Sequence, residues 1–438
     1  MADRPESVEG AARAFLRLAA FLALPACLIL SAPASCQAPT PPAAQSSPGG
    51  AQARPLSLAE AVRLAEAASL TGRQANAKVA GATARLRGAA ALPNPTLSLA
   101  QPFGQNTGGL DEDVLLTQTY ELGDKRRQRV RAARAERQAA VADRADIGTN
   151  VQLATETAYF EALRADAESQ LAQASLDSAK AFQKAAELQF TAGDVARSNV
   201  VRSGIEVTRA EQALDAAQTD RENRYATLRS LVGLPPGSPI VLTDPLGFTP
   251  REYALTDLRA LALRTRPDIV AARRTLEARR ALLHGAKVEG VPDLFVEARH
   301  SALDPTVGGS SVRVGVTLPI VDLGRNRADV KAAQASVTEQ AAVLAELERT
   351  ANLEIETAFR TFEQSRRAVA SFESGRLARS KELLDMAQTG YEHGANTYLE
   401  LLDAQQVYRA EQAEYTRALA AYNTALATLR HAVGGTLR

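Results

Sequence analysis

Residues 311–318 read Ser-Val-Arg-Val-Gly-Val-Thr-Leu, a stretch in which valine and leucine alternate strictly with other side chains. Such alternation places the apolar side chains on one face of a β-strand. The later residues 325–389 are rich in alanine and contain no proline and a single glycine, which indicates a very long helix. At about 1.5 Å per residue this helix would be about 100 Å long. The region therefore predicts a strand followed by a helix far longer than those of ordinary globular enzymes.

The chain contains the same pattern twice, offset by roughly 200 residues. The sequence Ala226-Thr-Leu-Arg229 recurs as Ala427-Thr-Leu-Arg430, and each copy is followed closely by Val-Gly. Phe190-Thr-Ala-Gly193 corresponds to Tyr391-Glu-His-Gly394. Because the matched glycines keep one order and one offset, we interpret the chain as an internal duplication.

Each half is predicted to have the same plan. Two short helices come first, over 58–69 and 72–90 in one half and over 256–264 and 267–288 in the other. A β-hairpin and a long antiparallel helical hairpin follow. The first repeat covers residues 56–252, with the β-hairpin at 96–120 and the helical hairpin at 124–232. The second covers residues 253–438, with the β-hairpin at 293–319 and the helical hairpin at 325–433.

The returning helices carry large residues seven apart, which predicts a coiled-coil seam with smaller residues opposite. In the second half these residues are Leu401, Tyr408, Tyr415, Tyr422 and Leu429.

The amino terminus has the features of a secretory signal. Arg13 and Arg17 precede an apolar run over 18–30, which is followed by the small-residue pattern Ala32-Pro-Ala34. We expect a signal peptide over 1–34 with cleavage after Ala34, and a Pro- and Ala-rich linker over 35–55. Acylation of Cys36 is an alternative way to process this segment.

Composition excludes several classes of function. The 438 residues include 51 Lys and Arg against 50 Asp and Glu, a net charge of +1, so no basic surface for nucleic acid is indicated. The only cysteines, Cys27 and Cys36, lie in the leader region, and the four histidines are far apart. No catalytic constellation, metal-ligand cluster or cofactor motif is present. We expect neither an enzyme nor a protein with a cofactor.

Four strands per chain leave two readings of the β-hairpins open. Soluble hairpins packed on helices fit the pattern as well as membrane strands do. An open sheet edge is unstable in lipid and small closed barrels begin at about eight strands, so membrane strands would require an oligomer that pools them.

The chain resembles the TolC-type outer membrane efflux proteins, and among them the CzcC-like heavy-metal branch. The resemblance covers residues 56–438. Its motifs are Leu56-Ser-Leu-Ala-Glu-Ala-Val-Arg-Leu-Ala65, Ala91-Leu-Pro-Asn-Pro95, Glu121-Leu-Gly-Asp-Lys-Arg126, Thr265-Arg-Pro-Asp268, Leu318-Pro-Ile-Val-Asp-Leu-Gly324 and the segment Tyr391–Gln405.

The resemblance implies a mainly α fold with a membrane β-barrel portion. It implies a homotrimer whose twelve-stranded barrel, four strands per chain, sits in the lipid of a Gram-negative outer membrane and continues as an α-helical barrel through the periplasm. The implied partners are a periplasmic adaptor and a proton-driven inner-membrane RND transporter, and no nucleic acid. The alternative function is a secreted periplasmic coiled-coil scaffold.

The resemblance also implies a gate at the periplasmic helix tips. Tyr391 matches the tip tyrosine of the family, and Glu400 and Asp403 match two acidic entrance positions. Asn396 stands where some members have an arginine, so an arginine latch is not implied. Because Glu400 and Asp403 are three residues apart they share a helix face, and in a trimer they would form a ring that attracts cations. The adaptor-docking turns implied by the resemblance are Gly193, Asp194 and Val195, and Gly394 and Ala395.

The sequence does not decide whether the cargo is divalent metal cations or organic compounds, because the inner-membrane transporter largely selects it. If the cargo is a metal, we expect the chain to conduct the ion without chelating it.

Overall fold

The computed structural model describes residues 54–100, 113–193, 195–301, 310–317, 324–435 and 437. The predicted signal peptide over 1–34, Cys36, nearly all of the predicted linker and Asp194 lie outside the described residues.

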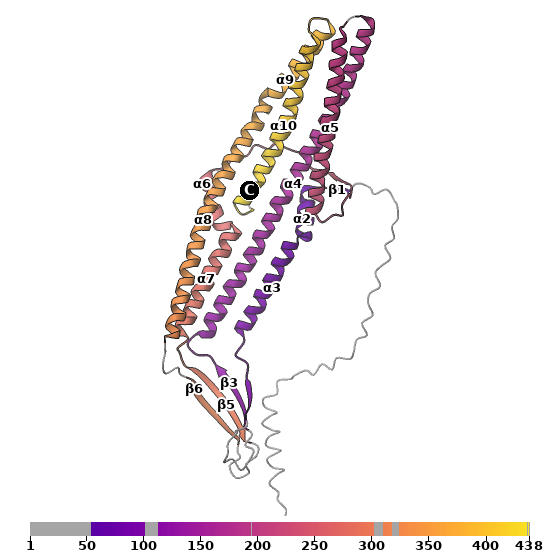
Figure 1. The fold of residues 1–438 in the computed structure, drawn as a ribbon. Coiled ribbons are helices and arrows are strands. Elements are labelled where there is room, and N and C mark those ends of the chain that lie inside the picture. The colour runs from indigo at the N-terminus through magenta and orange to yellow at the C-terminus, as the bar shows by residue number, and fades with distance from the viewer. Residues whose placement is uncertain are drawn as a thin grey trace, which may run out of the picture. The chain divides into compact units, whose positions relative to one another are not determined.

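Long helices dominate the described chain, as the proline-free runs predict. The helices are α2 (Leu58–Ala68), α3 (Leu70–Ala90), α4 (Lys125–Ala192), α5 (Arg197–Leu231), α6 (Leu255–Thr265), α7 (Pro267–Val288), α8 (Arg325–Ser371), α9 (Leu377–Glu392) and α10 (Tyr398–Ala432). The strands lie at one end of these helices and the tips of the two helical hairpins lie at the other (Figure 1). No described helix is both long enough and apolar enough to cross a membrane.

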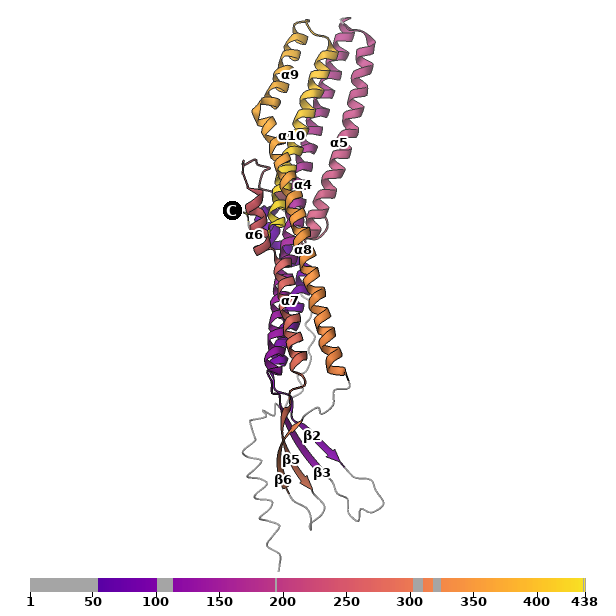
Figure 2. The same ribbon diagram turned by 90° about the vertical axis from the view of Figure 1, so that its left-hand side faces the viewer.

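Helix α4 is the element around which the others pack. It contacts α3 and α7 in the half near the strands, and α5 and α10 in the half near the tips. Helix α8 in turn lies against α7 and α10. Other helices therefore lie beside α4 along its whole length (Figure 1 and Figure 2).

The returning helices α5 and α10 end against the short helices of their own repeats, and a glycine makes each junction possible. Gly233 has φ of 71°, and a Cβ atom there would lie 2.6 Å from the Cβ of Ala68. Gly434 has φ of 90°, and a Cβ atom there would lie 2.9 Å from the Cα of Arg266. Only glycine combines a positive φ with so close an approach. These are the glycines of the two Val-Gly pairs.

The motif Thr265-Arg-Pro-Asp268 forms the second of these junctions. The Thr265 hydroxyl donates to the carbonyl of Val433 at 2.8 Å, which satisfies a free carbonyl at the end of α10. The buried Arg266 pairs with Asp268 and with Glu354 of α8, each at 2.6 Å. The motif therefore joins the α6–α7 junction to α8 and α10 and has a structural role.

The two β-hairpins form one antiparallel sheet. Its strands are β2 (Thr96–Ala100), β3 (Asp113–Tyr120), β5 (Asp293–Ser301) and β6 (Ser310–Thr317), in the order β2-β3-β5-β6. The register aligns Leu97, Leu116, Ala298 and Val312 across the sheet. Among the described strands, β2 and β6 each pair on one side only.

One face of this sheet is apolar and exposed. Leu97, Leu99, Val312, Val314 and Val316 are 62% to 76% exposed. The opposite face carries polar side chains, including the ion pair of Arg313 with Glu297. The strict alternation in the sequence therefore corresponds to two chemically different faces.

A small parallel sheet lies outside the predicted hairpins. Its strands are β1 (Arg54–Leu56) and β4 (Ile240–Leu242), and Arg54 and Pro55 pair with Ile240 and Val241. Strand β1 thus includes the last two residues of the segment predicted as linker, because the backbone N–H of Arg54 donates to the Pro239 carbonyl.

The expectation of an unbroken helix over 325–389 is wrong. Residues Phe372–Arg376 form a π-helical turn in which Gly375 has φ of 110°. Contacts with α10 hold this turn: Glu373 accepts from the Tyr415 hydroxyl at 2.7 Å, and Arg376 pairs with Glu411 at 2.6 Å. The corresponding helix of the first repeat, α4, continues without such a break.

Candidate functional site

The two turns at the hairpin tips are open and glycine-based. Gly193 ends α4 with φ of 86°, and Gly394 lies between α9 and α10 with φ of 72°. An added Cβ atom at either position would meet no other atom within 4 Å. Of the proposed docking residues, Gly193, Gly394 and Ala395 are exposed and Val195 is half-buried. The backbone of both turns is therefore accessible to another protein.

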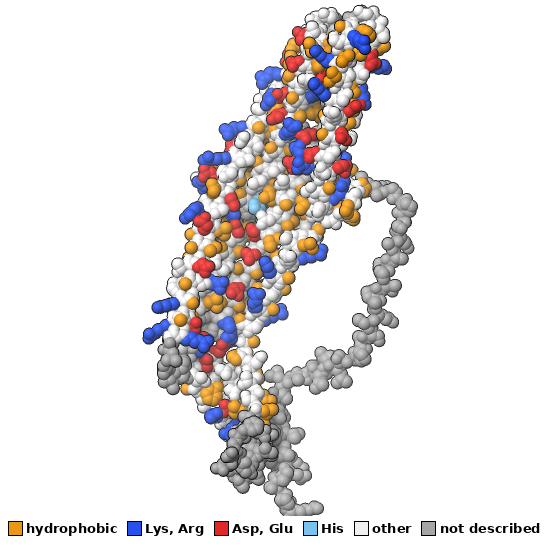
Figure 3. Space-filling view, in the orientation of Figure 1, with side chains coloured by type: hydrophobic (Ala, Val, Ile, Leu, Met, Phe, Trp, Pro, Cys, Tyr) orange, Lys and Arg blue, Asp and Glu red, His pale blue; other side chains and the backbone are white. Residues whose placement is uncertain are grey.

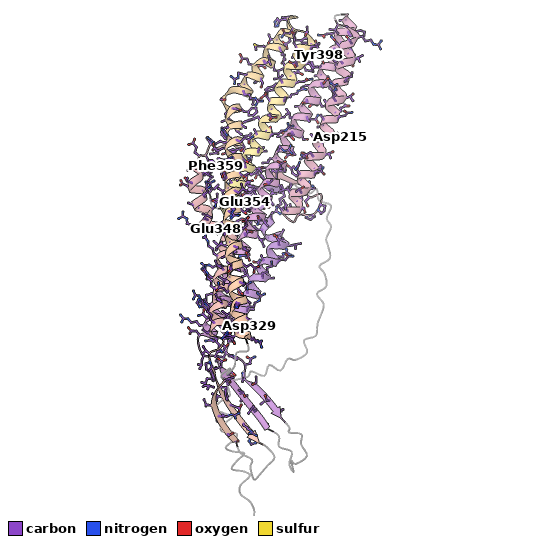
Figure 4. All side chains as sticks on the ribbon, turned by 60° about the vertical axis from the view of Figure 1, so that its left-hand side comes forward. Asp215, Asp329, Glu348, Glu354, Phe359 and Tyr398 are labelled. Carbon is purple, nitrogen blue, oxygen red and sulfur yellow. The ribbon has the colours of Figure 1, made fainter. Side chains whose placement is uncertain are left out.

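Tyr391 joins the tips of the two hairpins. Its hydroxyl donates to the side-chain oxygen of Gln189 on α4 at 3.0 Å. Its ring lies 6.3 Å from that of Tyr398, which in turn lies 6.3 Å from Phe182 of α4. Tyr398 sits near the tips on α10 (Figure 4). Burial, together with the charge of Glu206, raises the pKa of Tyr398, so its hydroxyl is neutral.

Asn396 shapes the turn between α9 and α10. Its backbone N–H donates to the carbonyl of Gly390 at 3.0 Å. A Cβ atom at position 390 would lie 2.5 Å from the Asn396 side-chain nitrogen, so the glycine makes room for the asparagine. The structure thus gives Asn396 a local packing role in a position where an arginine could have reached further.

Glu400 closes the first turn of α10. Its carboxylate accepts from the backbone N–H of Thr397 at 2.7 Å, and the Thr397 hydroxyl accepts from the backbone N–H of Glu400 at 3.3 Å. This reciprocal pair is a capping box. The negative charge also lies at the positive end of the helix dipole.

Asp403 faces a different neighbour. It lines a groove of about 350 Å³ between α10 and α5, together with Arg202, Glu206 and Arg209 of α5. Within one chain, therefore, the Glu400 carboxylate bonds to the start of its own helix, and Asp403 lines a groove beside α5.

Sequence reasoning missed the residues of the first repeat that meet the second at the tips. These are Phe182, Gln189 and Arg202. The available signal was the aromatic Tyr398 at the start of α10, which needs an apolar partner. Nothing in the sequence identifies that partner as Phe182, which is more than 200 residues away.

Charges of both signs are spread along the helices, with no stripe of one sign on the face in Figure 3. Among the described residues, no group of three or more His, Cys, Asp or Glu could hold a metal ion.

Comparison with known proteins places this architecture in a family. A model of the outer membrane efflux protein family matches residues 61–234 and 258–435. The cobalt-zinc-cadmium resistance protein CzcC of Cupriavidus metallidurans is 25% identical over 346 residues, covering 78% of this chain and 81% of the relative. Nodulation protein T of Rhizobium leguminosarum bv. trifolii is 28% identical over 281 residues, covering 60% of this chain and 58% of the relative.

Solved structures show the same fold. A crystal structure of CusC superposes with a TM-score of 0.73 at 19% identity, covering 86% of this chain and 92% of that one. VceC of Vibrio cholerae gives a TM-score of 0.72 at 21% identity, covering 86% and 96%. These findings confirm the resemblance seen in the sequence, the outer-membrane location in a Gram-negative bacterium, and a conduit rather than an enzyme. The chain is a member of the outer membrane efflux protein family.

Proposed function

We propose that this efflux channel component acts as a homotrimer and forms a passive exit duct. In this proposal three copies of the four-stranded sheet supply a twelve-stranded barrel in the outer membrane, and the helices continue as a tube through the periplasm. The observation that carries the proposal is the four-stranded sheet, with its exposed apolar face and its two edges.

The physical argument rests on backbone hydrogen bonds. An exposed face formed by Leu97, Leu99, Val312, Val314 and Val316 is stable against lipid chains. The free N–H and C=O groups on the outer edges of β2 and β6 are not, because lipid offers them no partner. Pairing β2 of one copy with β6 of the next removes every edge. The polar face with Arg313 and Glu297 would then line the water-filled interior.

The opposite end of the chain suits docking. Gly193 and Gly394 leave open space around both tip turns, so an adaptor could approach their backbone closely. We propose that a periplasmic adaptor binds there, at Gly193, Asp194, Val195, Gly394 and Ala395, and connects the duct to an inner-membrane RND transporter. Export energy would come from that transporter.

Tyr391, Asn396, Glu400 and Asp403 form the proposed gate. In a trimer the two carboxylates of each copy would add to a ring that favours cations. Because Glu400 also caps α10, alanine at this position would disturb the helix end as well as the charge. The charge is better tested with Glu400→Gln and Asp403→Asn, since glutamine keeps the capping box.

With both charges removed, we expect reconstituted pores to lose cation preference at an unchanged trimer yield. Cation-to-anion permeability ratios from reversal potentials measure this directly. Equal ratios in the wild type and the double variant would remove both carboxylates from the gate.

We propose divalent metal cations as cargo, because the relative CzcC is named for resistance to cobalt, zinc and cadmium. Deletion of the gene should lower tolerance to these ions, and a plasmid copy should restore it. Unchanged metal tolerance with increased sensitivity to organic compounds would favour organic cargo.

The assembly itself is tested by extraction. The outer membrane is dissolved in mild detergent, and the unboiled complex is weighed by native mass spectrometry. We expect a detergent-dependent species of three mature chains. A monomer or dimer released by salt would instead support the periplasmic coiled-coil scaffold. The same spectra distinguish cleavage after Ala34 from acylation of Cys36.

A further inference from the structure

Basic residues gather where the helices meet the four-stranded sheet. Helices α3 and α7 end there, and helices α4 and α8 begin there (Figure 1). These helix ends and their adjoining residues contain sixteen Lys and Arg against seven Asp and Glu, counted over 78–95, 121–137, 276–292 and 318–337. The whole chain has a net charge of only +1, so the remainder of the chain is acidic. We call the basic residues of these four segments the basic collar.

Only part of the basic collar holds the fold together. Lys125 pairs with Asp293 of β5 at 3.0 Å, and Arg129 pairs with Glu121, so these two cations fasten the start of α4 to the sheet. Other collar side chains are exposed and make no ion pair or hydrogen bond with any residue that the structure describes, among them those of Arg85, Arg131, Arg325, Arg327 and Lys331. Lys and Arg side chains project from this end of the helices in Figure 3. They are available to an anion outside the chain.

Helix electrostatics makes this arrangement unfavourable for the chain alone. The first turns of α4 and α8 contain Lys and Arg and no acidic residue. Cations at this end of a helix are repelled by the positive end of the helix dipole. Helices α2, α6, α7 and α10 follow the usual rule, each with an acidic residue in its first turn. Both repeats therefore break a local rule at the same end of the molecule, which is typical of a functional surface.

We propose that the basic collar binds the phosphate headgroups of anionic phospholipids in the periplasmic leaflet of the outer membrane. This proposal rests on the proposed duct, in which the apolar face of the sheet contacts acyl chains. The basic collar begins where the strands end, so an apolar surface is followed by a cationic one. A lipid leaflet has the same order, with hydrocarbon followed by a layer of headgroups.

The helix geometry brings these cations close to the headgroup layer. At 1.5 Å per residue, Arg131 and Lys331 lie about 9 Å from the starts of α4 and α8. Side chains on a helix lean toward its amino terminus, which for these two helices is the end at the sheet. Long Lys and Arg side chains can therefore carry their charge to the interface. In a trimer, three copies would surround the duct with a ring of such cations.

The first experiment counts lipids on the intact complex. Full-length protein is purified in mild detergent, titrated with phosphatidylglycerol, and measured by native mass spectrometry. The wild type should hold phosphatidylglycerol at several sites per trimer, and it should hold phosphatidylethanolamine more weakly because the amine of that lipid offsets the phosphate charge. A collar variant replaces four exposed cations by glutamine, at Arg131, Arg325, Arg327 and Lys331.

The size of the effect follows from the number of cations at each headgroup. A Lys or Arg beside an anionic lipid surface contributes about fivefold in affinity. If two cations share one headgroup, the collar variant should bind phosphatidylglycerol about 25-fold more weakly. A control variant that loses the same number of exposed cations away from the sheet should bind as the wild type does, with glutamine at Arg63, Arg73, Arg379 and Lys381. Equal affinity for phosphatidylglycerol in the collar variant and the wild type would overturn the proposal.

A second experiment measures depth in the bilayer without removing any charge. The chain contains no tryptophan, so one introduced tryptophan is the only source of that fluorescence. Leu122→Trp, at a position 42% exposed between β3 and α4, should be quenched by phospholipids labelled at the headgroup. Val314→Trp, on the apolar face, should be quenched by phospholipids labelled in the acyl chains. Quenching of Val314→Trp without quenching of Leu122→Trp would overturn the collar and leave the duct intact. Quenching of neither would overturn the duct, and the collar with it.

Discussion

Replacing Tyr391 by phenylalanine should loosen the tips without disturbing their packing. The change keeps the ring against Tyr398 and removes only the hydrogen bond to Gln189. A neutral hydrogen bond contributes about 1 kcal/mol. If three copies open together, the contacts between the hairpins lose about 3 kcal/mol, which shifts the ratio of closed to open channels by about 150-fold.

Single-channel recording of the reconstituted Tyr391→Phe protein measures this shift as open probability. Tyr408→Phe is the matched control, since the hydroxyl of Tyr408, unlike that of Tyr391, makes no hydrogen bond to any residue that the structure describes. The control should behave as the wild type does. Equal open probabilities in Tyr391→Phe and the wild type, at equal trimer yield, would refute the idea that this hydrogen bond holds the hairpins together.

Three further predictions concern the sheet, the junction and the helix cap. Val314→Lys places a charge on the apolar face and should destabilise the barrel in the bilayer by about 2–4 kcal/mol per copy, so outer-membrane trimers should disappear from unboiled gels. Ser311→Lys, on the opposite face, should assemble normally. Gly434→Ala forces a side chain into positive φ against the backbone at Arg266 and should lower the unfolding free energy by about 2–4 kcal/mol; a melting temperature equal to that of the wild type would contradict the junction. Thr397→Ala removes the cap of α10 at about 1 kcal/mol and should speed proteolysis at the tip, whereas Glu400→Gln should not.

Local pattern was enough to predict most individual elements. Alternation over 311–318 corresponds to β6, and the predicted helical hairpins over 124–232 and 325–433 contain α4 and α10. Pro267 at the first turn of α7 marked where that helix begins. These features depend on the neighbouring residues of the chain, which the sequence displays directly.

Features that depend on distant pairing could not be predicted. The sheet becomes continuous only because β3 pairs with β5, as in Leu116 beside Ala298, across about 180 residues of chain. The π-helical turn at Gly375 depends on Glu411 and Tyr415 of another helix. A single glycine in a helical run is usually tolerated, so it gave no warning of a break.

The proposed gate shows the same division. The positions of Tyr391, Glu400 and Asp403 came from the family resemblance, and their spacing alone suggested only a shared helix face. That Glu400 caps its helix could be read from Thr397 three residues earlier, which is the capping-box spacing. That Asp403 lines one groove with Arg202 of α5 could not, because Arg202 lies in the other half of the chain.

The central claim is that strands of different copies pair edge to edge. Cross-linking tests it most directly, with Ser98→Cys in β2 and Ser311→Cys in β6 of one chain, oxidised in outer membranes. Within one chain β3 and β5 separate these strands, a distance of about 14 Å, whereas a disulfide needs Cα atoms within about 7 Å. We therefore predict covalent dimers and trimers on reducing-agent-free gels. The barrel formed from three copies would be contradicted if only monomers appeared although both thiols react with a labelling reagent, and if cysteines at neighbouring positions of β6 also gave no cross-link.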